Sequence, residues 1–333
     1  MTTLDAIPFD SFADDPLPAS APAPDTLARR LLASGRIVIG GGVFLATLLA
    51  CVGTLPFTLW DRGRPAGEIH NSIYYDNADH PIRLKPRMWP AWDWFGTDPQ
   101  GRSLLGRSLL GGVVSLSVGV SAAAISIFLG VAVGLVSGYR GGWLDAVLMR
   151  TVDILYGLPY ILLIILLKIA LEPALYRFFS SKSAANMIVL FLAIGLVSWL
   201  TMARVVRGQV LSLRSLPFIE ACRAGGLTEM RIFFRHLLPN LIGPISVYAT
   251  LTIPQAILQE SFLSFLGIGI QPPMPSWGAL ASDALAPSLS TVHSYWWLLL
   301  FPCTLLAVTL LSLNFLGDGL RDVFDPKRVA AKI

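Results

Sequence analysis

The residue types that most often carry chemistry are scattered along this sequence. They comprise four histidines and three cysteines: His70, His80, His236 and His293, and Cys51, Cys222 and Cys303. A metal site or a hydrolytic active site needs several such side chains, or acidic ones, in one cluster. The G-x-x-x-x-G-K-[ST] loop that cradles nucleotide phosphates is also missing from the chain. The sequence therefore predicts a protein that is not an enzyme and that binds no metal or other cofactor itself.

Two ionisable residues draw attention because they lie in or beside long uncharged runs. Glu260 ends such a run and is followed by Ser261 and Ser264. We expect its carboxylate to pair within a helix bundle, and a direct contact with a solute is the alternative. Lys168 lies in another apolar segment, where we expect its ammonium to extend toward the nearer surface and to pair with Glu172 at i,i+4.

The composition shows what kind of solvent these residues meet. The chain has 333 residues, of which 54% are apolar and only 14% are charged, too little polar surface for a protein of this size in water. Its basic residues do not alternate with aromatic ones, which argues against nucleic-acid binding. Six apolar segments come close to or exceed the length that crosses a bilayer. They are 37–60, 108–139, 154–171, 186–203, 237–259 and 293–317. The predicted fold class is an all-α polytopic membrane protein with six transmembrane helices.

The distribution of Lys and Arg predicts the orientation of these spans. Arginines gather before the first span and between the fourth and fifth, whereas the 270–294 loop contains neither Lys nor Arg. Basic loops tend to stay in the cytoplasm, so we expect both termini there, in the inner membrane of a bacterial cell. We divide the chain into a disordered tail (1–28), a first span with an external loop (29–94), a five-span core (95–327) and a second tail (328–333).

Small residues predict close helix packing in the second span. Ser126, Gly130, Gly134 and Gly138 recur at four-residue intervals. This spacing places them on one face of a helix and lets another helix approach closely. In the fifth span, Pro244 and Pro254 predict kinks.

The cytoplasmic segment 204–240 predicts two short amphipathic helices. Ser215 can cap the first and Pro217 suits its first turn, with Phe218, Ala221 and Cys222 on one face. Gly225 and Gly226 end this helix. The second helix is expected to start at Thr228 and to end at Pro239. A short helix followed by a glycine hinge fits a cleft on another protein.

This segment resembles the EAA loop of ATP-binding-cassette (ABC) importer permeases. Glu220, Ala221, Cys222 and Gly226 stand at the spacing of that loop, followed by Leu238 and Pro239. Three further segments resemble the dipeptide/oligopeptide/nickel branch of this family: 95–103, 260–269 and 317–322. Within that branch the chain resembles the six-span, C-type subunit, with a type I importer fold.

The resemblance implies a set of partners and roles. It implies a homologous second permease, two ATP-binding subunits that carry ATP and Mg²⁺, and an extracytoplasmic solute-binding protein. It also implies that coupling to the ATPases runs through the EAA-loop residues, which are Phe218, Glu220, Ala221, Cys222, Gly226, Leu238 and Pro239. The implied first helix of this loop is a coupling helix.

The implied function is a membrane permease for di- or oligopeptides in which ATP hydrolysis by the partners drives alternating access. The alternatives are the same machinery importing nickel or another small solute, and an ion-gradient secondary transporter. A secondary transporter favours paired ionisable residues at mid-membrane and an internal repeat, and the sequence displays neither.

Overall fold

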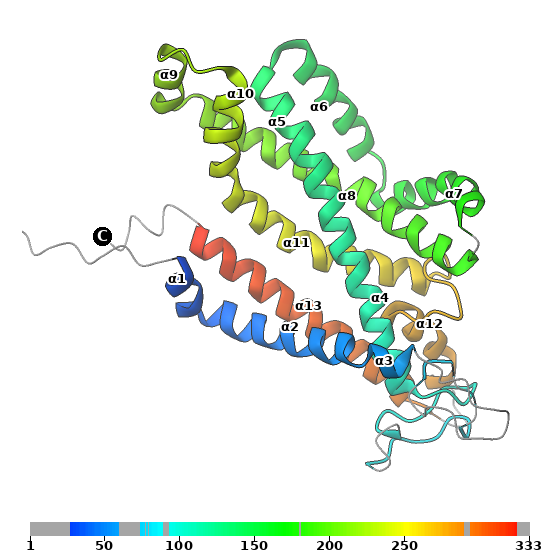
Figure 1. Ribbon diagram of the computed structural model, residues 1–333. Helices are drawn as coiled ribbons and strands as arrows, with labels where there is room; N and C mark the ends of the chain where they lie inside the picture. Colours follow the sequence, from blue (N-terminus) through cyan, green and yellow to red (C-terminus); the bar gives the residue numbers. More distant parts are fainter. Residues whose placement is uncertain are drawn as a thin grey trace, which may run out of the picture.

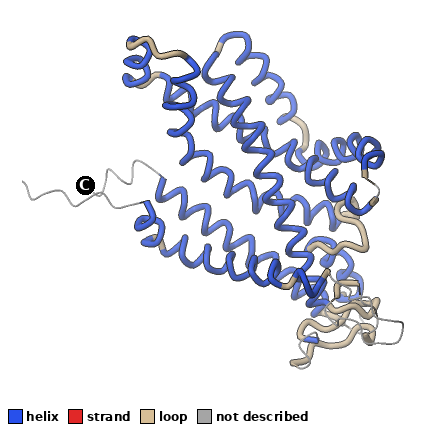
Figure 2. Tube along the Cα trace, viewed as in Figure 1, coloured by secondary structure: helices blue, strands red, loops and turns tan. Residues whose placement is uncertain are grey.

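A computed structural model gives the fold of this chain. It describes residues 27–59, 74–76, 78, 80–88, 93–179, 181–289 and 294–324. These residues form helices joined by loops, with one isolated bridge between Thr97 and Ser103 (Figure 1, Figure 2). The predicted tail 328–333, nearly all of the tail 1–28 and much of the segment 61–94 lie outside the described residues.

Five helical stretches are long and apolar enough to cross a bilayer. They are Gly35–Thr58 (α2, Gly35–Gly53, and α3, Leu55–Thr58); Leu104–Arg140 (α4, Leu104–Ile125, the π-helical turn η3, Ser126–Gly130, and α5, Val131–Arg140); Lys182–Arg214 (α8); Glu229–Phe265 (α10, Glu229–Ile232, the π-helical turn η4, Phe233–Leu237, and α11, Leu238–Phe265); and Trp297–Phe324 (α13). A short helix, α1 (Leu27–Ala33), precedes the first. Five of the six predicted spans are thereby confirmed.

The third predicted span, 154–171, is not one straight helix. It covers the end of α6 (Gly142–Tyr156) and the start of α7 (Tyr160–Phe178), and these two helices meet at an angle of 100°. Proline disfavours helical backbone at the residue before it, so Pro159 separates the two helices at Leu158. The sixth span exists only as this bent pair. Hydropathy could not reveal the bend, because the residues on both sides of it are apolar.

The segment that leads into the second span forms turns. Asp98 Oδ1 accepts hydrogen bonds from the backbone N–H groups of Gln100 and Arg102, both at 2.9 Å. Its Oδ2 accepts from Arg102 Nε at 2.8 Å. Helix α4 starts only at Leu104, with Ser103 as its N-cap. Asp98 therefore binds the turn that leads to the helix instead of capping a helix.

The helices are arranged so that the two described ends of the chain lie together. Helix α2 packs along α13, while α4 contacts both α8 and α11. Arg36 Nη1, at the start of α2, lies 3.0 Å from Asp322 Oδ2 near the end of α13. In Figure 1 these ends and α9 (Pro217–Ala224) lie toward one end of the molecule, and α3 and α12 (Trp277–Ser288) lie toward the other.

The line of small residues in η3 and α5 lies against α8. A Cβ added at Gly130 would come within 2.6 Å of Met202 Cβ, and one added at Gly134 within 2.6 Å of the Ala203 carbonyl oxygen. Ser126 Oγ, in the same line, donates to the Ser198 carbonyl oxygen at 3.1 Å. Gly138 faces Val210 in the same way. These residues thus set how closely the two helices pack.

Replacing Gly134 by Ala should lower stability, because the new Cβ meets the backbone oxygen of Ala203, which cannot move aside alone. Overpacking of this kind costs about 1–3 kcal/mol. Thermal unfolding of the detergent-purified protein measures the effect. The matched control is Gly42→Ala on α2, where an added Cβ meets nothing within 4 Å. Equal midpoints for the two variants would contradict the assigned contact.

Candidate functional site

Helix α9 projects from the bundle and is anchored by one side chain. Ile219 is fully buried and packs with Ile232 and Leu237. Phe218, Glu220 and Ala221 are exposed on the other side of the helix, and Cys222 is half-buried. The expected face of Phe218, Ala221 and Cys222 is therefore divided, because Cys222 turns inward beside Ile219. The helix offers its outer face for contact with another molecule.

One expected helix cap in this segment differs from the structure, while Thr228 takes the N-cap position of α10 as expected. Ser215 ends α8, and Leu216 takes the N-cap position of α9. Gly226 has a φ of +72°, a backbone conformation that glycine adopts at little cost, and it follows the end of α9.

The second predicted helix does not end at Pro239. Glu229–Phe265 is one continuous helical stretch that includes Leu238, Pro239 and the π-helical turn η4. Proline fits the first turn of a helix, and here a wider turn precedes Pro239 and lets the helical path continue. The amphipathic end near α9 and the membrane span are consequently parts of a single element.

Glu260 lies in a buried network of hydroxyl groups near the far end of α11. Its side chain is 0% exposed. Its carboxylate accepts hydrogen bonds from Ser264 Oγ at 2.6 Å, Ser115 Oγ at 3.0 Å and Ser261 Oγ at 3.5 Å. The position of Glu260 is therefore inside the bundle, joining α11 to α4.

The same serines tie down the chain that follows α11. Ser264 Oγ accepts from the Ile270 N–H at 3.0 Å, and Ser115 Oγ accepts from the Trp277 N–H at 3.3 Å. Trp277, fully buried at the start of α12, also donates its indole N–H to the Ser108 carbonyl oxygen at 2.9 Å. The 266–276 loop is thus fixed between α11, α4 and α12.

Lys168 contributes to this fixation, and the expectation that it extends to the surface is wrong. The residue is 6% exposed, and its ammonium donates to the carbonyl oxygens of Ile268 and Gly269. Glu172 instead accepts a hydrogen bond from the Tyr176 hydroxyl at 2.6 Å. The partners of the Lys168 ammonium are therefore backbone carbonyl oxygens about 100 positions along the chain, and not the carboxylate of Glu172.

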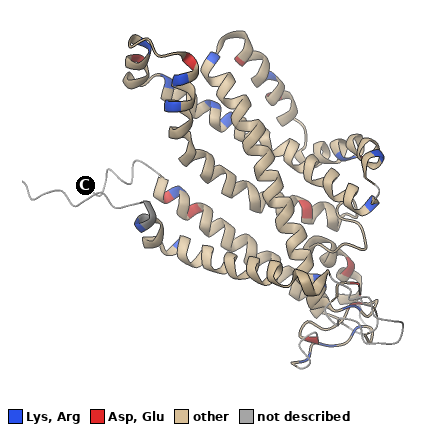
Figure 3. Ribbon diagram, viewed as in Figure 1, with Lys and Arg blue, Asp and Glu red and all other residues tan. Residues whose placement is uncertain are grey.

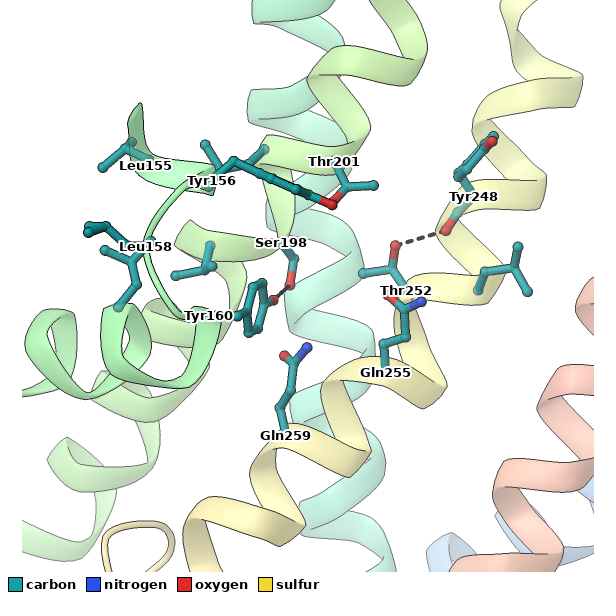
Figure 4. A pocket seen from close by; sticks show the side chains of 14 residues that line it. Leu155, Tyr156, Leu158, Tyr160, Ser198, Thr201, Tyr248, Thr252, Gln255 and Gln259 are labelled. Carbon is teal, nitrogen blue, oxygen red and sulfur yellow. Dashed lines mark hydrogen bonds between the residues drawn. The ribbon is translucent and has the colours of Figure 1, made fainter. Parts of the chain in front are cut away.

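A cavity of about 440 Å³ lies between the α6–α7 bend, α8 and α11 (Figure 4). Its polar groups are hydroxyls and carboxamides from all three sides. They belong to Tyr156, Tyr160, Ser198, Thr201, Tyr248, Thr252, Gln255 and Gln259. No residue of this site was predicted from the sequence. The available signal was the spacing of Tyr248, Thr252, Gln255 and Gln259, which repeats every three or four residues and marks one helix face.

At one edge of the cavity, Arg204 is held by Tyr156, which belongs to the lining, and by Asp153, which does not. The Arg204 guanidinium lies over the Tyr156 ring, 4.0 Å from its centroid. Arg204 Nη2 also lies 2.7 Å from Asp153 Oδ1. On the next turn of α8, Arg207 forms two hydrogen bonds with Asp145, at 2.6 and 2.7 Å. These pairs connect α6 to α8, the first near the bend and the second at the start of α6.

Residues 130–329 match the family model described as "Binding-protein-dependent transport system inner membrane component". The chain belongs to this family. It is a membrane-embedded permease subunit of an ABC importer, and the alternative of an ion-gradient secondary transporter is thereby wrong. The matched range includes α9, the three glycines that face α8 (Gly130, Gly134 and Gly138), Glu260 and the helices that surround the cavity, α6, α7, α8 and α11.

Relatives of this permease agree over most of its length. The oligopeptide transport system permease protein OppC of Escherichia coli (strain K12) is 46% identical over 253 residues, covering 76% of this chain and 78% of the relative. The dipeptide transport system permease protein DppC of Bacillus subtilis (strain 168) is 44% identical over 234 residues, covering 70% and 68%.

A solved structure supports the fold of this permease. The inward-facing MetNI methionine ABC transporter has a chain that superposes with a TM-score of 0.51 at 20% identity. The superposition covers 66% of this chain and 96% of the other. The type I importer fold expected from the resemblance is confirmed.

Replacing Ser264 by Ala should destabilise the permease more than replacing Ser261 by Ala. Ser264 makes the shorter bond to Glu260 and also accepts from the Ile270 N–H, so its loss leaves two buried groups unsatisfied. We expect a cost of about 1–3 kcal/mol for Ser264→Ala. The 3.5 Å contact of Ser261 should contribute less than about 0.5 kcal/mol. Thermal unfolding in detergent compares them, and an equal loss would contradict the network.

Proposed function

We propose that this chain is the C-type permease of a di- or oligopeptide importer. A homologous second permease completes the channel, two ATP-binding subunits bind at α9, and an extracytoplasmic solute-binding protein delivers the peptide from the opposite side. ATP and Mg²⁺ belong on the ATP-binding subunits rather than on this chain. Relatives named for oligopeptides and dipeptides support peptide cargo over nickel.

The observation that carries the proposed coupling is the form of α9. A short helix projects from the bundle on a buried Ile219 anchor, with Phe218, Glu220 and Ala221 exposed. Aromatic side chains in partner pockets supply much of the binding energy at protein interfaces, and Phe218 is 41% exposed. Movement of α9 passes into α11 through the packing of Ile219 on Ile232 and Leu237. Leu238 and Pro239 continue this path into the membrane.

Charge supports the proposed orientation. Arginines are clustered around α9 and α10, at the end of the molecule near α1 and the end of α13 (Figure 3). Basic segments beside membrane helices favour the cytoplasm. We therefore place both termini and α9 in the cytoplasm, with the membrane being the bacterial inner membrane. In that orientation, Glu260 and the 266–276 loop lie toward the outer side.

Replacing Glu220 by Ala should weaken binding of the ATP-binding subunits. The carboxylate is exposed on α9 and in the first turn of that helix, so its loss should leave the permease folded. A loss of about 1 kcal/mol would weaken the association about fivefold. Co-purification of the subunits with tagged permease measures it. The control is Glu172→Ala at the far end of α7, and undiminished co-purification for Glu220→Ala would remove this residue from the interface.

Replacing Gly226 by Val should uncouple ATP hydrolysis from uptake. The φ of +72° disfavours a β-branched residue, although an added Cβ would meet nothing within 4 Å. The strain of about 1–2 kcal/mol should shift α9 without removing the protein from the membrane. Uptake and ATP hydrolysis are measured on the same vesicles. Gly208→Val is the control, since Gly208 has open space and helical backbone on α8. Normal uptake by Gly226→Val would contradict the role of Gly226 as a hinge behind α9.

A further inference from the structure

The cavity between α6, α7, α8 and α11 has hydrogen-bonding groups but no formal charge. None of its 14 lining residues is Asp, Glu, Lys, Arg or His. On α11, Tyr248, Thr252, Gln255 and Gln259 follow one another at intervals of four, three and four, and so share a face. Tyr160 and Ser198 lie opposite them (Figure 4). The helix presents a polar stripe, defined by these four α11 residues, to a cavity whose other walls also carry hydroxyl groups.

Several acceptors in the cavity have capacity left for a ligand. Gln259 Oε1 is buried and accepts no hydrogen bond from the described residues. Thr252, which lines the cavity, donates its hydroxyl to the Tyr248 carbonyl oxygen at 2.8 Å, so its oxygen can still accept a hydrogen bond. Tyr160 Oη and Ser198 Oγ lie 3.1 Å apart, and Ser198 donates to Ile194 O. The cavity therefore offers acceptors on both sides.

A peptide main chain has the chemistry that matches this lining. Each residue other than proline brings one N–H donor and one C=O acceptor, and taking these groups out of water is costly unless partners replace it. Carboxamides supply both a donor and an acceptor, and hydroxyls do the same. A cavity of about 440 Å³ falls within the range of about 300–1,000 Å³ that holds small ligands.

We propose that this cavity is the chamber that holds the peptide during translocation, and that the polar stripe of α11 binds main-chain amides whatever the charge of the side chains. The proposal rests on the proposed function, since it requires a peptide importer. The stripe gives length and sequence tolerance, because every peptide carries the same main-chain groups. Arg204, paired with Asp153 and covered by Tyr156, stays outside the lining and so does not select for acidic side chains.

The test uses the assembled transporter in proteoliposomes with its solute-binding protein. Gln259→Leu and Thr252→Val should each reduce uptake about three- to tenfold, the factor expected from one lost hydrogen bond. The reduction should be the same for a neutral, an acidic and a basic tripeptide of equal length. ATP hydrolysis and co-purification of the ATP-binding subunits should stay unchanged, since α9 is unaltered. The affinity of the solute-binding protein for each tripeptide is measured separately, and the uptake rates of the three tripeptides are corrected for the differences in affinity.

The matched control is Thr250→Val on the same helix. Thr250 makes the same kind of bond as Thr252, to a backbone oxygen four residues earlier, but it lies near Gly317 of α13 and outside the cavity. Uptake by Thr250→Val should equal that of the unaltered protein. Equal losses for the two threonine variants, or losses that depend on peptide charge, would overturn the proposal.

A second measurement does not depend on the folding of any variant. A tripeptide with a photoreactive side chain, trapped during transport by the unaltered complex, should label α11 between Tyr248 and Gln259 or the facing part of α8. Labelling confined to other helices would contradict the proposal that this cavity holds the peptide. Failure of the unaltered complex to import any of the three tripeptides with ATP would instead reject the proposed function itself.

Discussion

The constraint on which this structure depends is that hydrocarbon offers no hydrogen-bond partners, so every polar group within it needs one from the protein. The Glu260 carboxylate meets this demand with serine hydroxyls from two helices. Lys168 meets it with the carbonyl oxygens of Ile268 and Gly269, which belong to a loop and have no helical partners. Each solution ties together segments that are distant in the sequence. The polar groups that membrane insertion makes costly are therefore the ones that fix the end of the bundle opposite to α9 (Figure 1).

A single helical stretch brings the functional regions together. Glu229–Phe265 has 37 residues and is about 55 Å long at 1.5 Å per residue. Its first turns pack on the Ile219 anchor of α9, its middle carries the polar stripe, and its last turns hold Glu260. Pro244 lies between the first turns and the stripe, Pro254 lies within the stripe, and each removes a backbone donor from the helix. The stretch can therefore bend between the α9 end and the cavity, and within the wall of the cavity itself.

What the sequence could predict followed from local patterns. Apolar length identified five spans, and the four-residue spacing of Gly130, Gly134 and Gly138 predicted a close helix contact. Pro217 and Gly226 marked the limits of a short helix that the structure contains. Each of these signals lies within a few turns of one helix, where geometry relates spacing to position directly.

What the sequence could not predict depends on distant contacts. Lys168 binds a loop about 100 residues away and Glu260 a serine 145 residues away, and no local spacing identifies such partners. The bend at Leu158 was missed for a different reason: hydropathy is continuous across it, although Pro159 was a local signal for a break in the helix. The cavity was not predicted because its three walls come from separate helices, although the polar residues of its α11 wall recur at helical spacing.

The neutral lining of the cavity has an electrical consequence. Moving one elementary charge through a membrane potential of 100 mV involves about 2.3 kcal/mol of work. A lining without acidic or basic side chains supplies no counterion to travel or to reorient with the solute. If the cavity holds the cargo as proposed, this chain's lining adds no moving charge of its own, and neutral and charged cargo should differ in the electrical work of crossing the membrane.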